Sequence, residues 1–214
     1  MNTVNANDQL VNIAQICRKA PTATLRRAFV RALREWCQQT QWLLITLQGA
    51  TVANQQQYTL GDDPQLDIIG IKAIQATMTG STGIQTWPLV TSDSTTWDPN
   101  MPPGLPTKYC YIPEAQFALQ PIPNAVYGLT LTAILQPKED AVNIPQAPLL
   151  KYSNEIEAGA LAYLLAVPGQ PWSNPTESAR REREFRAGIS NGKADAQRAF
   201  NVGPMRARPR QFLV

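Results

Sequence analysis

The sequence contains no histidine among its 214 residues. This absence excludes catalytic triads and dyads that use imidazole as the general base, metal sites with histidine ligands and histidine-based pH switches. The sequence also has no glycine-rich phosphate loop, nucleophile elbow or lysine–carboxylate constellation. We therefore predict that the protein is not an enzyme and that it binds no cofactor and no metal.

Cysteine and long apolar runs are also scarce. The three cysteines, Cys17, Cys37 and Cys110, are widely spaced and form no Cys-x-x-Cys pair, which favours small, buried, reduced thiols. The longest apolar run, residues 158–167, is far shorter than the roughly 20 residues of a membrane-spanning helix. Residues 1–8 have neither the basic nor the apolar region of a secretory signal. We expect no contact with a membrane.

Charge is distributed unevenly along the chain. Residues 1–48 carry six basic and two acidic side chains, residues 49–150 carry three and eight, and residues 151–214 carry ten and six. The net charges are therefore +4, −5 and +4. A chain with two basic ends and an acidic middle can stack on itself or on partners, and charge complementarity fixes the register of such contacts.

Apolar residues recur with helical spacing near the N-terminus. A short helix is predicted around residues 10–17, and a longer one begins at Pro21 and Thr22. One face of the longer helix is apolar and consists of Leu25, Phe29, Leu33 and Trp36. Another face carries the three arginines Arg27, Arg31 and Arg34.

The stretch from residue 149 to 191 predicts two further helices. The first is rich in alanine and glycine, so that another backbone can approach it closely. The proline-rich residues 167–172 end it, and Asn174 with Pro175 begins the second helix. The second helix carries alternating acidic and basic residues around Phe185 and Ile189, which we predict to be buried.

Short β-prone segments separate these helical parts. Strands are predicted at residues 43–52, 58–60, 69–76, 84–90, 107–112, 117–119 and 129–135, with the first two forming a hairpin. Residues 88–148 contain 11 of the 18 prolines, and proline confines strands to edges and short ladders.

We therefore predict an α+β fold. A helical bundle would form from the N- and C-terminal helices, residues 1–48 and 149–200. A small antiparallel β domain, residues 49–148, would be inserted between them, and residues 201–214 would form an extended C-terminal tail.

Several segments, in this order, carry a resemblance to a known family. They are the early helix FVRALREWC (29–37), the hairpin QYTL (57–60), the turn GLPTKY (104–109), the strand-then-proline step FALQPIP (117–123) and the closing pair of helices (149–191). In this order the chain resembles the head-to-tail adaptor, or connector, proteins of tailed bacteriophages, which include tubular tail protein A of short-tailed phages. The resemblance spans roughly residues 20–195.

The resemblance implies a structural protein of the virion, assembled in the host cytoplasm. It implies a ring of about twelve copies with cyclic symmetry that joins the portal vertex to the tail and extends the DNA channel. The implied partners are the portal protein, a downstream tail or nozzle protein, and packaged DNA that passes without sequence-specific contact. A related head-completion or tail-tube component remains an alternative.

Two sets of residues are candidates for contacts between subunits or with the tail. Trp97 lies in the polar loop 91–104, which is either a solvated surface loop or an anchor on a neighbour. The basic faces of the predicted helices supply the second set, which consists of Arg27, Arg31, Arg34, Arg180 and Arg183.

The tail is a candidate for docking on the portal protein. Arg206, Arg208 and Arg210 alternate, so that in an extended chain they project to one side, and the apolar residues Phe212, Leu213 and Val214 follow. A disordered tail is the alternative. Our hypothesis is that the tail binds along an acidic groove of a portal subunit, where a ring of tails gains avidity.

Two other function classes are less well supported. A sequence-independent nucleic-acid-binding protein is compatible with the pI of about 8.8, but there is no zinc motif and no RNP-type strand. Asp62, Asp63 and Asp67 could cluster around a divalent cation in an enzyme, although Asp62-Asp63-Pro64 is also a strong turn signal.

Overall fold

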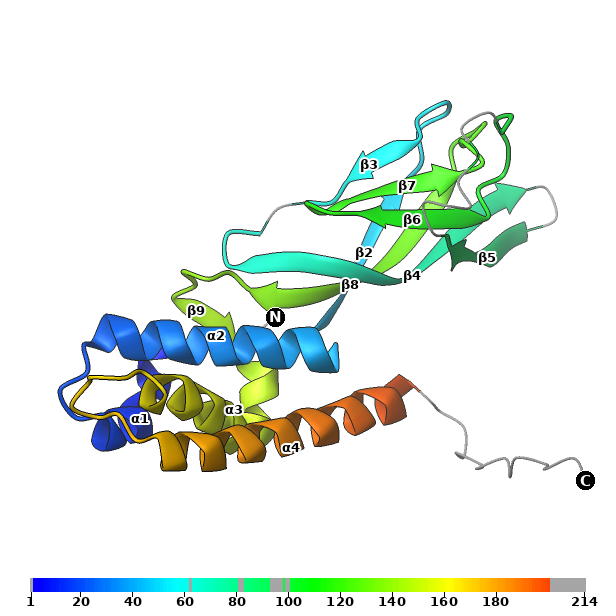
Figure 1. Ribbon diagram of the computed structural model, residues 1–214. Coiled ribbons are helices and arrows are strands. Elements are labelled where there is room, and N and C mark those ends of the chain that lie inside the picture. The colour runs from blue at the N-terminus through cyan, green and yellow to red at the C-terminus, as the bar shows by residue number, and fades with distance from the viewer. Residues whose placement is uncertain (1, 62, 81–82, 93–97, 99–100, 201–214) are drawn as a thin grey trace, which may run out of the picture.

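The computed structural model describes residues 2–61, 63–80, 83–92, 98 and 101–200. Figure 1 shows a layer of helices below a curled sheet. The helices are α1 (Val11–Ile16), α2 (Thr22–Thr40), α3 (Gln146–Leu165) and α4 (Pro175–Phe200), with a short 3-10 helix at Ala6–Gln9. The strands are β1 (Thr3–Asn5), β2 (Leu44–Ala50), β3 (Gln57–Thr59), β4 (Leu66–Gly80), β5 (Gly83–Thr91), β6 (Lys108–Ile112), β7 (Gln116–Gln120), β8 (Gly128–Pro137) and β9 (Asn143–Pro145).

Seven strands form one curled sheet in the order β2-β8-β4-β5-β6-β7-β3. Neighbouring strands are antiparallel except β5 and β6, which pair in parallel over two residues. The concave side is filled by an apolar cluster of its own, which includes Ile74, Phe117, Leu119 and Leu131. The remaining strands, β1 and β9, form a separate two-stranded sheet.

The predicted fold class is wrong. The protein is a mixed α and β protein dominated by the seven-stranded sheet, not a helical bundle with a small β insert. The prediction overestimated the effect of proline, because six of the 11 prolines in residues 88–148 lie in described connections between strands. Strand β4 has 15 residues and no proline, and β8 has ten residues with proline only at its last position.

The predicted hairpin of residues 43–52 and 58–60 is also absent. Strand β3 pairs with β7 and not with β2, which pairs with β8. The two strands are adjacent in sequence but lie at opposite edges of the sheet. Local sequence could not show this, because the partner of each strand lies more than 50 residues away.

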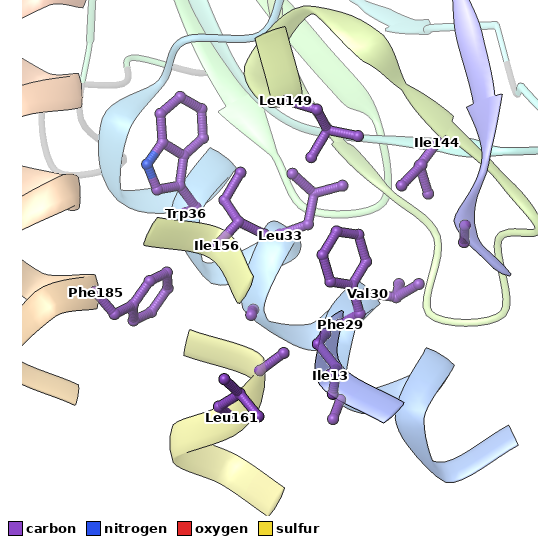
Figure 2. Close-up of a cluster of buried hydrophobic side chains, with 14 of the residues drawn as sticks. Ile13, Phe29, Val30, Leu33, Trp36, Ile144, Leu149, Ile156, Leu161 and Phe185 are labelled. Atoms are coloured by element: carbon purple, nitrogen blue, oxygen red, sulfur yellow. The ribbon is translucent and has the colours of Figure 1, made fainter. Parts of the chain in front are cut away.

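The helical layer has a second apolar core. Phe29, Leu33 and Trp36 of α2 are fully buried, as the helical spacing predicted. Figure 2 shows Trp36 and Leu33 on either side of Ile156 of α3, with Phe29 nearer to Val30 and Ile13 and Phe185 on α4. Helix α3 therefore packs against both α2 and α4.

Small residues let α3 and α4 approach closely, as the sequence predicted. A Cβ atom on Gly159 of α3 would lie 2.7 Å from the Phe185 ring, closer than carbon atoms can pack. On α4, a Cβ on Gly188 would lie 2.5 Å from Glu155 of α3. The loop between the helices turns at Gly169, whose φ of 75° favours glycine.

We expect Gly159→Ala to lower the free energy of unfolding by roughly 1–2 kcal/mol, because overpacking outweighs the better helix propensity of alanine. The measurement is denaturant unfolding followed by circular dichroism. Gly61→Ala is the control, since nothing lies within 4 Å of its added methyl group. Equal stability of Gly159→Ala and the parent protein would contradict the close packing of α3 on α4.

Candidate interaction surface on helix α2

The structure brings three of the predicted contact residues, Arg27, Arg31 and Arg34, to one groove. This groove has a volume of about 450 Å³ and lies between α2, the C-terminal half of α3 and the segment after β8. Its lining consists of Thr24, Arg27, Ala28, Arg31, Arg34, Glu139, Tyr163, Leu164 and Val167. We call it the arginine groove.

Helical spacing places these arginines on one face of α2. Positions four and three residues apart fall on neighbouring turns, so the side chains of Arg27, Arg31 and Arg34 are stacked along the helix. Arg27 and Arg31 are exposed and Arg34 is half-buried. Leu164 and the partly exposed Val167 supply an apolar floor.

Arg31 is held in place by an aromatic side chain of α3. Its guanidinium carbon lies 4.4 Å from the centre of the Tyr163 ring, within range of a cation–π interaction. The Tyr163 hydroxyl donates a hydrogen bond to the carboxylate of Glu35. Burial and this hydrogen bond raise the pKa of Tyr163 to about 12, so the ring stays neutral at physiological pH.

Arg34 is engaged inside the molecule. Its Nη1 donates to Oδ2 of Asp67 at 3.2 Å and to the carbonyl oxygen of Pro137 at 2.7 Å. These bonds join α2 to β4 and β8. Arg27, in contrast, makes no hydrogen bond or ion pair with any described residue. Of the three arginines, Arg27 and Arg31 are therefore available to a partner.

The predicted contact residues of α4 lie outside the arginine groove. Arg180 forms ion pairs with Glu177 and Glu184 of its own helix. The hydrogen bond from Arg180 holds the pKa of Glu177 at about 2. Arg183 is exposed, and its only contact with a described residue is a hydrogen bond to the carbonyl oxygen of Ala179. These charges mainly stabilise α4.

Several predicted residues lie outside the described part of the chain. They are Trp97, Asp62 and the tail residues Arg206, Arg208, Arg210, Phe212, Leu213 and Val214. Of the suggested cation ligands, Asp63 caps the backbone amides of Gln65 and Leu66, and Asp67 pairs with Arg34. The described residues contain no cluster of three histidine, cysteine, aspartate or glutamate side chains that could hold a metal ion.

The predicted burial of the thiols is confirmed for Cys17 and Cys37, whereas Cys110 is only half-buried. Burial raises the pKa of Cys17, and that of Cys37 to about 12, so neither is a reactive thiolate near neutral pH. Among the helices described, none is both long enough and apolar enough to span a membrane.

Sequence analysis missed the roles of Tyr163 and Glu35. The two residues lie 128 positions apart in sequence. Only the packing of α3 on α2 brings the two together. No local pattern could have identified this pair.

No protein-family model matches the sequence, and no curated protein matches it. The likeness to phage adaptors therefore depends on the order of the segments alone.

Arg34→Met should lower the free energy of unfolding by about 1–2 kcal/mol, because two hydrogen bonds are lost and a half-buried carboxylate is left without its partner. Arg27→Met is the matched control on the same helix and should change it by less than about 0.5 kcal/mol. Urea titrations of both variants measure the difference. Equal effects would show that Arg34 does not join the two layers.

The raised pKa of Tyr163 predicts a loss of stability in alkali. A tyrosine whose pKa is higher in the folded state contributes its full stabilisation below its ordinary pKa of about 10 and loses it as pH rises toward 12. The unfolding free energy of the parent should therefore fall more steeply between pH 10 and 12 than that of Tyr163→Phe. Parallel curves would contradict the assigned Tyr163–Glu35 bond.

Proposed function

We propose that the protein is a structural adaptor of a tailed-bacteriophage virion. It forms a ring of identical subunits that joins the portal vertex to the tail and extends the DNA channel. The order of segments along the chain supports this proposal. The observation that carries it is the arginine groove, which offers exposed cations over an apolar floor, as a protein-contact surface does.

The distribution of charge supports assembly from like subunits. The helical layer presents Arg27 and Arg31 without carboxylate partners among the described residues, whereas residues 49–150 have a net charge of −5. An exposed acidic residue of the sheet, Glu114, lies at the turn between β6 and β7. A ring is built from two different, complementary surfaces of each subunit, and these two charge regions provide such a pair.

In this proposal the helical layer faces the portal protein and the sheet faces a downstream tail or nozzle protein. Packaged DNA passes through the channel without sequence-specific contact. The ion pairs along α4 reduce the positive potential that nucleic-acid binding would need, because Glu177, Glu182 and Glu184 alternate with its arginines. Binding to DNA as the primary function is therefore the weaker candidate.

Charge reversal in the arginine groove tests the proposal. The double variant Arg27→Glu/Arg31→Glu should weaken assembly of the ring on the portal protein by at least about tenfold, because like charges then face each other where the groove meets the acidic sheet of the neighbouring subunit. The matched control is Arg18→Glu/Lys19→Glu, which changes the net charge equally on exposed positions outside the groove. Binding is measured by sedimentation of the portal protein of the same phage mixed with each variant.

The experiment distinguishes a groove that is not part of the contact from a protein that is not an adaptor. Assembly of the groove variant at parent strength would remove the groove from the contact but leave the adaptor function standing. A parent protein that does not bind the portal protein at any concentration would contradict the adaptor function itself. A steep dependence of duplex DNA binding on salt, at the same protein concentration, would favour the nucleic-acid alternative.

A further inference from the structure

The seven-stranded sheet is curled but not closed. Its two edges, β2 and β3, form no ladder with each other. A cavity of about 260 Å³ opens between them. The cavity reaches the apolar core of the sheet, since it is lined by Leu47, Leu60, Phe117, Leu129 and Leu131. We call this opening the seam.

The edge of β2 that borders the seam has no strand partner among the described residues. Just beyond its end, the backbone N–H and C=O of Val52 bond to the Tyr58 hydroxyl of β3. Leu135 N–H donates to the carbonyl of Leu43, and Thr51 N–H donates to that of Tyr127. Odd-numbered residues of β2 therefore bond to β8, and the even-numbered residues direct their N–H and C=O groups outward. Protein edges are usually blunted by charge, proline or a bulge, yet residues 36–61 contain no charged residue and no proline.

The edge of β3 offers similar groups from the other side. Gln56 accepts from Leu119 N–H, and Leu60 N–H donates to the carbonyl of Ala115. Even-numbered residues thus bond to β7, so the backbone groups of Gln57 and Thr59 point away from β7. Of these groups, the Gln57 carbonyl already accepts a hydrogen bond from Gln55 Nε2 at 2.8 Å. An extended segment in the seam would meet backbone partners at its edges and an apolar floor, as in recognition by strand addition.

A second cavity adjoins the seam, and its lining includes Asp67 and Gln136, which bond to side chains of α2. It has a volume of about 630 Å³ and shares residues 59–61 with the seam. Its lining includes the carboxylates of Asp67 and Glu114. Glu114 is exposed and forms no ion pair with a described residue. A segment that arrives from the helices therefore passes Asp67, which is already paired with Arg34, and the exposed Glu114 before it reaches apolar groups.

We infer that residues 210–214 of this same chain occupy the seam as an added strand. The order of charged and apolar residues in the tail matches the order of the acidic and apolar groups that line the two cavities. Arg206, Arg208 and Arg210 precede the apolar residues 212–214. The five residues after Pro209 contain no proline, and Phe and Val favour extended structure. A dry cavity of about 150 Å³ accommodates benzene, so the seam has room for the ring of Phe212.

The end of α4 puts the tail within reach of the seam. A Cβ atom on Gly192 would lie 2.8 Å from Thr40, so α4 passes beside the last residue of α2, just before β2 begins. Figure 1 shows the end of α4 on the side of the molecule where α2 leads into β2. Helix α4 continues for about 12 Å beyond Gly192, and the 14 residues of the tail span up to about 46 Å when extended.

Attachment to α4 gives the tail a high effective concentration at the seam, so that a weak strand contact is populated. This inference concerns the protein without any partner bound and does not rest on the proposed function.

Hydrogen exchange tests the inference on the isolated full-length chain. The outward amides of Thr46 and Gln48 should exchange at least about tenfold more slowly in the full chain than in a chain truncated after Phe200. The full-length variant Phe212→Ser/Leu213→Ser keeps every charge of the tail and leaves residues 1–200 unchanged. It should exchange as fast as the truncated chain, while Asn201→Ser, the control, should keep the protection.

Equal exchange of Thr46 and Gln48 in all four proteins would overturn the inference. Repeating the experiment at tenfold lower protein concentration separates the chain's own tail from that of a second copy. Protection that persists on dilution supports the intramolecular strand, and protection that is lost on dilution would assign the seam to another copy and contradict it.

Discussion

The candidate contact surface depends on the position of α3, which is packed between α2 and α4. Gly159 lies directly against the ring of Phe185, and the small residues around it hold α3 between α4 and α2. This packing directs Tyr163 toward α2, where it contacts Arg31 and bonds to Glu35. The arginine groove is therefore a consequence of helix packing, and a wider separation of α2 and α3 would displace its floor.

A second constraint joins the helical layer to the sheet. Arg34 connects α2 to β4 and β8, and Gln38 of the same helix donates to Gln136 at the end of β8. The same arginine that the sequence assigned to a partner is thus an internal connection. Because these bonds lie at the helical end of β4 and β8, the sheet is fixed there, while its β2 and β3 edges remain unpaired among the described residues.

Local sequence predicted the helices and most strands, because their signals are short in range. Asn174 caps α4 through a hydrogen bond to Glu177 N–H, and the apolar face of α2 is buried as its spacing required. The fold class could not be predicted in the same way. Whether strands make a small domain or one large curled sheet depends on pairings such as β3 with β7, which are distant in sequence. The candidate site could likewise be predicted only in part. Helical spacing predicted that the arginines share one face of α2, but it could not predict that Tyr163 of α3 contacts them.

The central claim is that this chain assembles into a ring on a portal protein. Native mass spectrometry of the purified chain, alone and mixed with the portal protein of the same phage, tests it most directly. The account predicts either one preformed high-order ring or monomers that convert to a saturating ring when the portal protein is added. A chain that stays monomeric at every ratio to the portal protein would contradict it.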